Sequence, residues 1–217
     1  MTACAADVDL GPLAGVPLHQ LPSPHSTTFE NQYGPDGRTQ YLRGRATPLA
    51  PADVPAEWLR APIVHLAPLA GELDPEFFTA FDGALLGLTA QGWLRGWDAS
   101  GRVHRRDWPA AGGYLPRAQA VVLSVEDVNG DWALLERWAG LTPLLVVTQG
   151  RQGCTVFRRG ESPRQFPAPP QLEVDPTGAG DIFAAAFFIH LYETGDPWAA
   201  ARQANAQAAI TVTPPGL

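Results

Sequence analysis

Short apolar runs alternate with helical stretches after about residue 62, and this alternation restricts the fold more than any other feature of the sequence. Buried strands are predicted at residues 63–67, 120–123, 144–148 and 154–157. A helix is predicted to start at Asp74-Pro75-Glu76, which offers a cap, a first-turn proline and an acidic residue, and another over Asp131–Ala139. Short strands that alternate with helices favour an α/β fold with a mostly parallel sheet.

The last third of the chain predicts two helices. An apolar run at residues 172–174 leads into Asp175-Pro176-Thr177-Gly178-Ala179-Gly180-Asp181. The residues that follow, Ile182 to Tyr192, are too apolar for a surface helix, so a buried helix is predicted to begin at this glycine turn. A second, Ala-rich helix is predicted over Trp198 to Ile210, with Pro197 in its first turn, and Pro214-Pro215-Gly216 forbids its continuation.

Length and composition favour one domain over residues 1–217. A chain of this size buries roughly 70% of the surface that it exposes when unfolded, and 45% of its residues are hydrophobic. Between Thr27 and Arg45, two segments rich in Thr, Phe and Tyr flank Gly34-Pro35-Asp36-Gly37. This pattern predicts a β-hairpin, which could act as a flap.

Charge and residue usage argue against several classes of protein. The formal net charge is -7, so no nucleic-acid footprint is expected. All 15 basic residues are Arg, which excludes a lysine Schiff base and a Gly-Lys-Ser/Thr phosphate loop. No apolar run reaches the about 18 residues of a membrane span. Cys4 and Cys154 predict neither a metal site nor a disulfide framework, which fits a reducing, cytoplasmic setting.

The glycine turn before Ile182 has the composition of an anion site. Glycines at Gly178 and Gly180 let backbone amides approach a ligand, and the helix start supplies unpaired N–H groups and positive potential. Asp181 in the first helical turn is stabilised as a carboxylate by about 0.3 to 1 kcal/mol if exposed. A carboxylate beside such amides could deprotonate a hydroxyl while the amides hold phosphoryl charge. The alternative is an ordinary capped helix with an acidic first turn.

The segment from Asp175 through the small-residue helix resembles the C-terminal signature of the ribokinase-like, or PfkB, family of carbohydrate and nucleoside kinases. The resemblance implies a three-layer α/β/α ribokinase-like fold. It also implies that Asp181 is the catalytic base and that the amides of Gly178, Ala179 and Gly180 form an anion hole for the transferring phosphoryl group. Pro176 stands where the family usually has Thr, so no ion-binding role is assigned to that loop.

Residues 120–217 are, on the same resemblance, the nucleotide-binding and catalytic half. Thr148, Gly150 and Gly153 match the strand and turn that lie against ATP in the family, with a plain hairpin turn as the alternative. Asn205 matches a helix beside adenine, so it could approach the base or ribose, or it could simply cap or pack.

Asp127 is the candidate metal residue. Ser124 and Asp127 replace the Asn and Glu of a family motif that organises magnesium and phosphate. A shorter carboxylate could still hold a water of Mg²⁺, because this ion keeps several waters and needs few protein ligands. A solvated acidic turn is the alternative.

The first half of the chain resembles the family less specifically, through Thr28 to Asn31, Gly37-Arg38, Gln40-Tyr41 and Val64 to Pro68. The usual opening strand with a substrate-binding Asp and the following Gly-Gly segment are not found, so we expect the N-terminal strands of the fold to be missing. Exposed sheet edges, and with them a homodimer, could follow. Gln91-Gly92-Trp93-Leu94-Arg95 is similar to sugar-kinase sequences, but no role follows from the sequence; a packed turn is the alternative.

Together these features predict an ATP- and Mg²⁺-dependent kinase that phosphorylates a hydroxyl of a small sugar, polyol or nucleoside. The alternative is a catalytically impaired, nucleotide-binding remnant of a sugar kinase with a regulatory or structural role.

Overall fold

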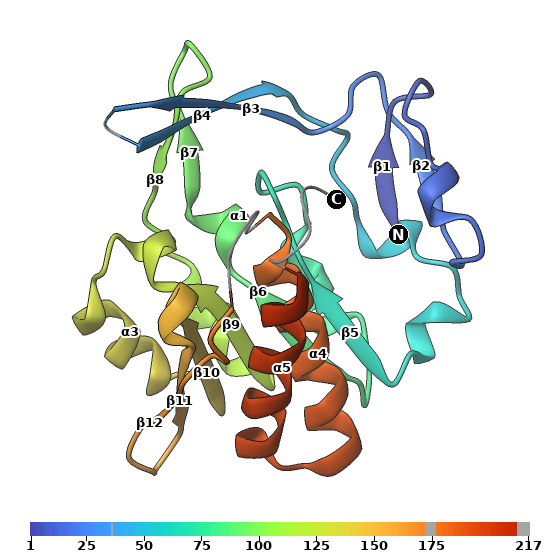
Figure 1. Cartoon of the computed structure of the whole chain (residues 1–217). Helices are drawn as coiled ribbons and strands as arrows, with labels where there is room; N and C mark the ends of the chain where they lie inside the picture. The colour runs from blue at the N-terminus through green and yellow to red at the C-terminus, as the bar shows by residue number, and fades with distance from the viewer. Residues whose placement is uncertain (36, 172–176, 212–217) are drawn as a thin grey trace.

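The computed structural model describes residues 1–35, 37–171 and 177–211, and a six-stranded sheet of order β12-β11-β10-β9-β6-β5 lies at its centre (Figure 1). The parallel strands are β5 (Ile63–Leu66), β6 (Leu85–Thr89), β9 (Ala120–Ser124) and β10 (Leu144–Thr148). The sheet continues in antiparallel fashion with β11 (Cys154–Arg158) and β12 (Arg164–Phe166). The predicted mostly parallel sheet is confirmed.

Helices cover both faces of the sheet because its strands are apolar on both sides. In β9, Val121 and Leu123 belong to one buried cluster, and Ala120 and Val122 to the other, as the alternation of side chains along a strand requires. The first cluster contains residues of α3 (Trp132–Ala139), and the second contains residues of α4 (Ala179–Thr194) and α5 (Pro197–Thr211). The three-layer α/β/α, ribokinase-like arrangement is therefore confirmed.

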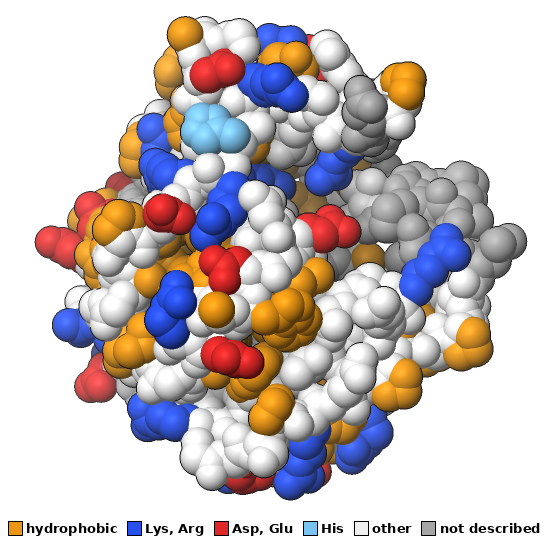
Figure 2. All heavy atoms as spheres, turned by 90° about the vertical axis from the view of Figure 1, so that its left-hand side faces the viewer, with side chains coloured by type: hydrophobic (Ala, Val, Ile, Leu, Met, Phe, Trp, Pro, Cys, Tyr) orange, Lys and Arg blue, Asp and Glu red, His pale blue; other side chains and the backbone are white. Residues whose placement is uncertain are grey.

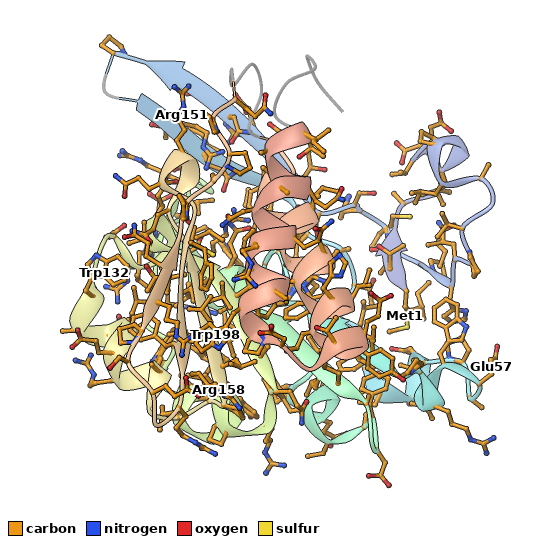
Figure 3. The ribbon with its side chains drawn as sticks, turned by 60° about the horizontal axis from the view of Figure 1, so that its bottom comes forward. Met1, Glu57, Trp132, Arg151, Arg158 and Trp198 are labelled. Atoms are coloured by element: carbon orange, nitrogen blue, oxygen red, sulfur yellow. The ribbon has the colours of Figure 1, made fainter. Side chains whose placement is uncertain are left out.

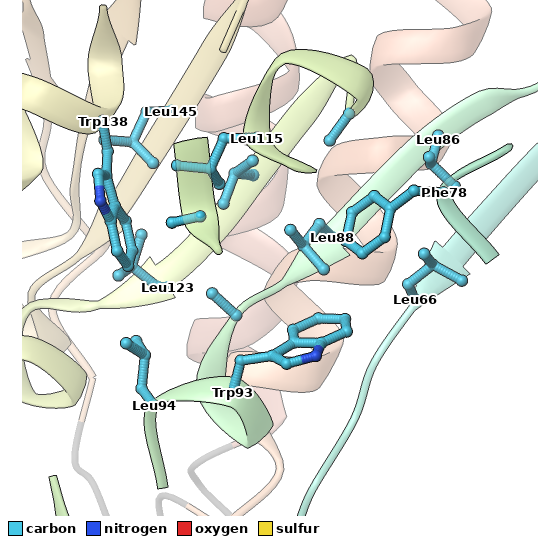
Figure 4. Close-up of a cluster of buried hydrophobic side chains, with 14 of the residues drawn as sticks. Leu66, Phe78, Leu86, Leu88, Trp93, Leu94, Leu115, Leu123, Trp138 and Leu145 are labelled. Carbon is cyan, nitrogen blue, oxygen red and sulfur yellow. The ribbon is translucent and has the colours of Figure 1, made fainter. Parts of the chain in front are cut away.

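The first cluster ties the strands to the short elements that connect them (Figure 4). Leu88 and Leu123 of the sheet belong to it together with Phe78 of the 3-10 helix η4 (Pro75–Thr79), Trp93 of α1 (Gln91–Leu94) and Trp138 of α3. On the other face Trp198 of α5, labelled in Figure 3, stacks on Phe166 of β12, and the ring centroids are 6.0 Å apart. Both faces of the sheet are thus fixed by large side chains.

α4 lies directly on the sheet because a glycine makes room for it. The ring of Phe188, which is 1% exposed, occupies the space where a Cβ at Gly87 of β6 would stand, 2.7 Å from its ring carbons. Phe183, Phe187 and Leu191 are buried from the same helix. This close packing holds α4 against β6, between the edge strand β5 and β9.

Gly87→Ala is expected to destabilise the fold by about 1–3 kcal/mol, the usual cost of overpacking a core. Gly112→Ala is the matched control, because Gly112 lies in α2 (Ala111–Tyr114) with open space around its Cβ position, and Ala is favoured there by up to about 1 kcal/mol. Urea denaturation of both variants checks this. Equal midpoints for Gly87→Ala and the wild type would contradict the packing argument.

Two hairpins form a lid above the sheet (Figure 1). We use "lid" for β3 (Thr28–Gly34) with β4 (Gly37–Gly44) and β7 (Arg95–Trp97) with β8 (Val103–Arg105). An isolated bridge between Tyr41 and Arg102 and a 2.8 Å hydrogen bond from Leu42 N to the Gly101 oxygen join them. Figure 2 shows Arg and acidic side chains interspersed on the face toward its viewer. The predicted hairpin is confirmed, although Asp36 of its turn lies outside the described residues.

The N-terminal segment forms a small separate sheet of two parallel strands, β1 (Thr2–Cys4) and β2 (Gln20–Pro22). Between this segment and β5 lies an apolar cavity of about 670 Å³, which contains none of the predicted site residues. The remaining short 3-10 helices are η1 (Gly11–Leu13), η2 (Pro51–Asp53), η3 (Trp58–Arg60), η5 (Leu115–Arg117), η6 (Val125–Val128) and η7 (Gly150–Gln152).

Most predicted elements are found within one or two residues of their expected bounds. The helix predicted at Asp74 is the main correction: Asp74 does accept a 2.8 Å hydrogen bond from Glu76 N, but only the five-residue η4 follows. The predicted run at residues 172–174 and Pro214-Pro215-Gly216 lie outside the described residues. Cys4 and Cys154 are both free thiols, as expected. None of the helices formed by described residues has the length and apolarity to cross a membrane.

His65 lies in β5 under α4 and is held there in its neutral form. Its ring meets that of Phe188 edge-on, with centroids 4.9 Å apart, and Nε2 lies 3.2 Å from the Thr89 hydroxyl. Burial lowers the pKa of His65 from 6.5 to about 4. Because the unfolded chain binds this proton near pH 6.5 and the folded chain only near pH 4, the fold loses stability as the pH falls through that window.

His65→Leu is expected to weaken this pH dependence. The free energy of unfolding of the variant should change less between pH 7 and pH 4.5 than that of the wild type, because no imidazole remains to be protonated in the unfolded chain. Urea titrations at both pH values measure the difference, and identical pH slopes for the two proteins would show that His65 is not the group involved.

Candidate active site

A cleft of about 90 Å³ lies at the carboxyl ends of the parallel strands. Its lining residues are Ala67, Pro68, Leu69, Thr89, Gln91, Val122, Leu123, Ser124, Asp127, Thr148, Gly180 and Asp181. Nearly all of them stand at or just after the end of β5, β6, β9 or β10, or at the start of α4. This edge is where open α/β sheets bind ligands, because the connecting loops diverge there.

The N-terminus of α4 contributes backbone amides and a carboxylate to the cleft. Gly178 is the N-cap residue, with φ 79° in the left-handed region that favours glycine, and Ile182 N donates a 3.0 Å hydrogen bond to its oxygen. The N–H groups of Ala179, Gly180 and Asp181 therefore precede the first intrahelical hydrogen bond and remain available to an anion. Asp181 is exposed and lines the cleft. The helix start at the glycine turn is as predicted, and the role of these groups toward a phosphoryl group stays a prediction.

Asp127 faces the same cleft from the end of β9. One of its oxygens accepts a 2.9 Å hydrogen bond from Ser124 N and so caps η6, and the other accepts a 3.2 Å bond from Gln91 Nε2. Burial raises the pKa of Asp127, and hydrogen bonds from Ser124 and Gln91 and the charge of Arg95 oppose the rise. Asp127 is therefore a capping residue and a cleft residue at once.

Thr148 and the two glycines that were predicted to lie beside a nucleotide have different local roles. Thr148 lines the cleft, and its hydroxyl donates a 3.4 Å bond to the Leu123 oxygen. Gly150 has φ 55° and open space around it. Gly153 has φ 90°, and a Cβ there would collide with the Phe166 oxygen. The turn thus requires Gly153 for the approach of the strand end at Phe166, and its role toward ATP stays a prediction.

Asn205 is used by the protein itself. Its side chain is 5% exposed, and its amide donates a 3.0 Å hydrogen bond to the Phe166 oxygen and contacts the Cys154 sulfur at 3.6 Å. Burial raises the pKa of the Cys154 thiol to about 12. Asn205 is not among the residues that line the cleft. The packing alternative describes the observed contacts, and the proposed approach to a base or ribose stays a prediction.

Two polar residues that line the cleft, Thr89 and Gln91, were given no role from the sequence. Thr89 ends β6, a strand that was not predicted because Gly87 interrupts its apolar run. Gln91 was noted without a role, and the structure gives it one through its bond to Asp127. The signal that could have found both is position, since they end and follow the strand next to β9.

This chain is similar in sequence to known carbohydrate, inositol and cytidine kinases. The model of the pfkB family carbohydrate kinases matches residues 132–217. The inositol 3-kinase of Zea mays is 30% identical over 185 residues, which are 81% of this chain and 45% of that protein. The cytidine kinase of Thermococcus kodakarensis is 27% identical over 71% of this chain and 56% of its own length. The chain thus spans about half the length of these curated relatives.

Solved structures of low sequence identity share the fold. A pyrophosphate-dependent kinase of the ribokinase family, complexed with a pyrophosphate analog and myo-inositol, has a TM-score of 0.82 at 22% identity and covers 99% of this chain and 80% of its own. The ribokinase of Arabidopsis thaliana, complexed with ribose and ATP, has a TM-score of 0.72 at 21% identity, and the match covers 100% of this chain and 76% of that ribokinase. This chain has the ribokinase-like fold. Its residues 132–217 resemble the pfkB carbohydrate kinases, as the sequence predicted.

The residues of the cleft fit a magnesium ion better than a metal that needs a protein cage. Among the described residues there is no cluster of three or more His, Cys, Asp or Glu side chains that could hold a metal. Asp127 and Asp181 nevertheless present two carboxylates to one cleft. Mg²⁺ is commonly held by one or two carboxylates together with phosphate oxygens and waters, so these two side chains are of the type that would hold it.

Asp127→Asn is expected to be at least as stable as the wild type at pH 7. Because the pKa of Asp127 is raised in the fold, the wild type loses stability as the pH rises through the window just above 3.8, and the loss is fully present at neutral pH. The amide oxygen can still accept the hydrogen bond from Ser124 N. Thermal unfolding at pH 7 and at pH 4 measures the difference, which should shrink at the lower pH.

Asp53→Asn is the matched control, because Asp53 caps η2 through a 2.8 Å bond from Ala50 N and lies outside the cleft. An Asp127→Asn variant that is less stable than the wild type by the same amount at both pH values would contradict the burial cost assigned to Asp127.

Proposed function

We propose that this chain is an ATP-dependent kinase that transfers a phosphoryl group to a hydroxyl of a small sugar, polyol or nucleoside. One observation carries the proposal: Asp181, Asp127 and the N-terminal amides of α4 meet in a single cleft at the carboxyl edge of the sheet. The relatives support the class of acceptor, since they include inositol, cytidine and fructose kinases. In the proposed reaction, a bond forms between the acceptor oxygen and phosphorus, and the bond from phosphorus to the donor's bridging oxygen breaks.

Asp181 is the proposed catalytic base. It is exposed and lines the cleft at the start of α4. In this role it orients the acceptor hydroxyl and takes its proton as the new bond to phosphorus forms. The amides of Ala179 and Gly180, preceded by the turn at Gly178, hold the negative charge of the transferring group because they point from the same helix end.

The donor and its magnesium ion are assigned to the same edge of the sheet. Thr148 ends β10 and Gly150 begins η7, and these two residues are the proposed donor-side contacts. Asp127 is the proposed holder of a magnesium water. Bound Mg²⁺ would neutralise phosphate charge and keep the donor in line with the acceptor.

Two free, buried thiols are compatible with the reducing, cytoplasmic setting expected from the sequence. Neither nucleic acid nor a membrane is proposed as a partner, and a homodimer stays a prediction.

A catalytically impaired nucleotide-binding protein is the second candidate, and one observation favours it. Both oxygens of Asp127 already accept hydrogen bonds, from Ser124 N and Gln91. This carboxylate therefore has less capacity to organise metal waters than a free one. The second candidate predicts donor binding without phosphoryl transfer.

Asp181→Asn is expected to lower turnover about 100-fold to 10,000-fold, the range for loss of a general base, while donor binding is retained. The assay follows phosphoryl transfer from ATP, and separately from pyrophosphate, to myo-inositol, ribose, fructose and cytidine. Glu193→Gln is the control, since Glu193 lies on the same helix near its other end and, within the described part of the chain, forms an ion pair with His190 at 3.5 Å.

Turnover by Asp181→Asn at the wild-type rate would refute the assignment of the base. Binding of ATP by a wild-type protein that phosphorylates none of these acceptors would favour the second candidate.

A further inference from the structure

The segment Gln91 to Arg95 forms a tightly packed turn whose two end residues lie near the cleft. Gly92 packs so closely on the Pro68 carbonyl that a Cβ would collide with it. Trp93 and Leu94 are 8% and 2% exposed, and both belong to the first cluster, which contains the residues of α3. These contacts fix α1, with Gln91 lining the cleft at one end and Arg95 immediately after the other.

Arg95 bridges the lid and the cleft wall. Its guanidinium carbon lies 5.0 Å from the ring centroid of Phe29 in β3, and its Nη1 donates a long, 3.4 Å hydrogen bond to the oxygen of the cleft residue Leu69. No carboxylate of the described residues forms an ion pair with it within 4.0 Å. A guanidinium has five N–H donors, so most of them remain free for a ligand.

The charges around Arg95 leave a place for an anion. Burial lowers the pKa of Arg95, the carboxylates of Asp127, Asp181 and Glu72 oppose this effect, and the like charge of Arg38 adds to it. Arg38 is exposed in β4, beside the hairpin turn. Arg95 thus carries a charge between Phe29 of the lid and the cleft residue Leu69, and no described ion pair neutralises it. An anion bound at its free N–H groups would offset the cost of burying this charge.

We propose that Arg95 binds the phosphoryl group as it passes from donor to acceptor, through its free N–H groups on the lid side of the cleft. This inference rests on the proposed function and deepens it, because it adds a cation opposite the amides of α4. The non-bridging phosphoryl oxygens are its ligands. They keep their charge while the bond to the donor oxygen breaks, the bond to the acceptor oxygen forms and the proton goes to Asp181. Arginine suits this role because its planar fork matches paired phosphate oxygens.

The test compares Arg95→Gln and Arg95→Lys with Arg102→Gln. Arg102 is an exposed arginine at the far end of the β7 and β8 hairpin, which makes it a control for charge alone. Binding of inorganic pyrophosphate and of ATP, each with Mg²⁺, is measured by calorimetry, and phosphoryl transfer by the acceptor assay above. Thermal unfolding reports whether each variant is folded, and Arg95→Lys retains the charge should Arg95→Gln fail to fold.

Arg95→Gln should weaken pyrophosphate binding about 10-fold and lower kcat by about 100-fold or more, as for loss of one donor to a developing anion. Arg95→Lys should restore only part of the pyrophosphate affinity and part of kcat, because an ammonium group cannot form two parallel hydrogen bonds to a pair of phosphate oxygens. Arg102→Gln should match the wild type. Full recovery in Arg95→Lys would assign Arg95 to balancing the carboxylates and overturn the proposal.

The failure of this inference is distinguishable from that of the proposed function. If Arg95→Gln binds pyrophosphate and turns over like the wild type, the Arg95 proposal falls and the kinase assignment stands. If the wild type binds pyrophosphate without phosphorylating any acceptor, and Arg95→Gln loses that binding, the phosphate site stands and the kinase assignment falls. A wild type that binds neither probe overturns the Arg95 proposal.

Discussion

The packing of α4 on β6 is the contact on which the candidate site depends. Phe188 occupies the space above Gly87, which allows the helix axis to come close to β6. The start of α4 lies at the carboxyl ends of the neighbouring strands. Asp181 and Asp127, which are 54 residues apart in the sequence, then line one cleft. The arrangement of the candidate site therefore depends on core packing.

The same cleft shows how stability and chemistry compete. Asp127 is partly buried, which raises its pKa and disfavours its charged form, yet a charged oxygen is what a magnesium water requires. The cap on η6 and the bond from Gln91 offset part of that cost. Arg95 has the same conflict with the opposite sign, since burial disfavours its charge and the carboxylates around the cleft favour it. Buried groups of opposite charge that stay out of contact are suited to receiving a polar ligand.

Much of the fold could be predicted because local patterns determine it. The apolar runs of β5, β9 and β10 and the cap at Asp131, which accepts a 2.9 Å bond from Leu134 N, are visible without tertiary contacts. β6 could not be predicted, because Gly87 interrupts its apolar pattern. A glycine is needed at this position to make room for Phe188, which is about a hundred residues away in the sequence. The cluster at Asp181 was recognisable from its glycine turn. The bond between Gln91 and Asp127 and the engagement of Asn205 with Phe166 were not, because both join distant segments.

The central claim is that the first amides of α4 and the carboxylate of Asp181 form one side of an anion site that Asp127 shares. Amide NMR of the whole chain, titrated with inorganic pyrophosphate in the presence of Mg²⁺, tests it most directly. The account predicts that the largest shifts fall on the amides of Ala179, Gly180 and Asp181, with a smaller group of shifts around Asp127. Shifts confined to other parts of the chain, or unchanged signals at the start of α4 under saturating pyrophosphate, would contradict it.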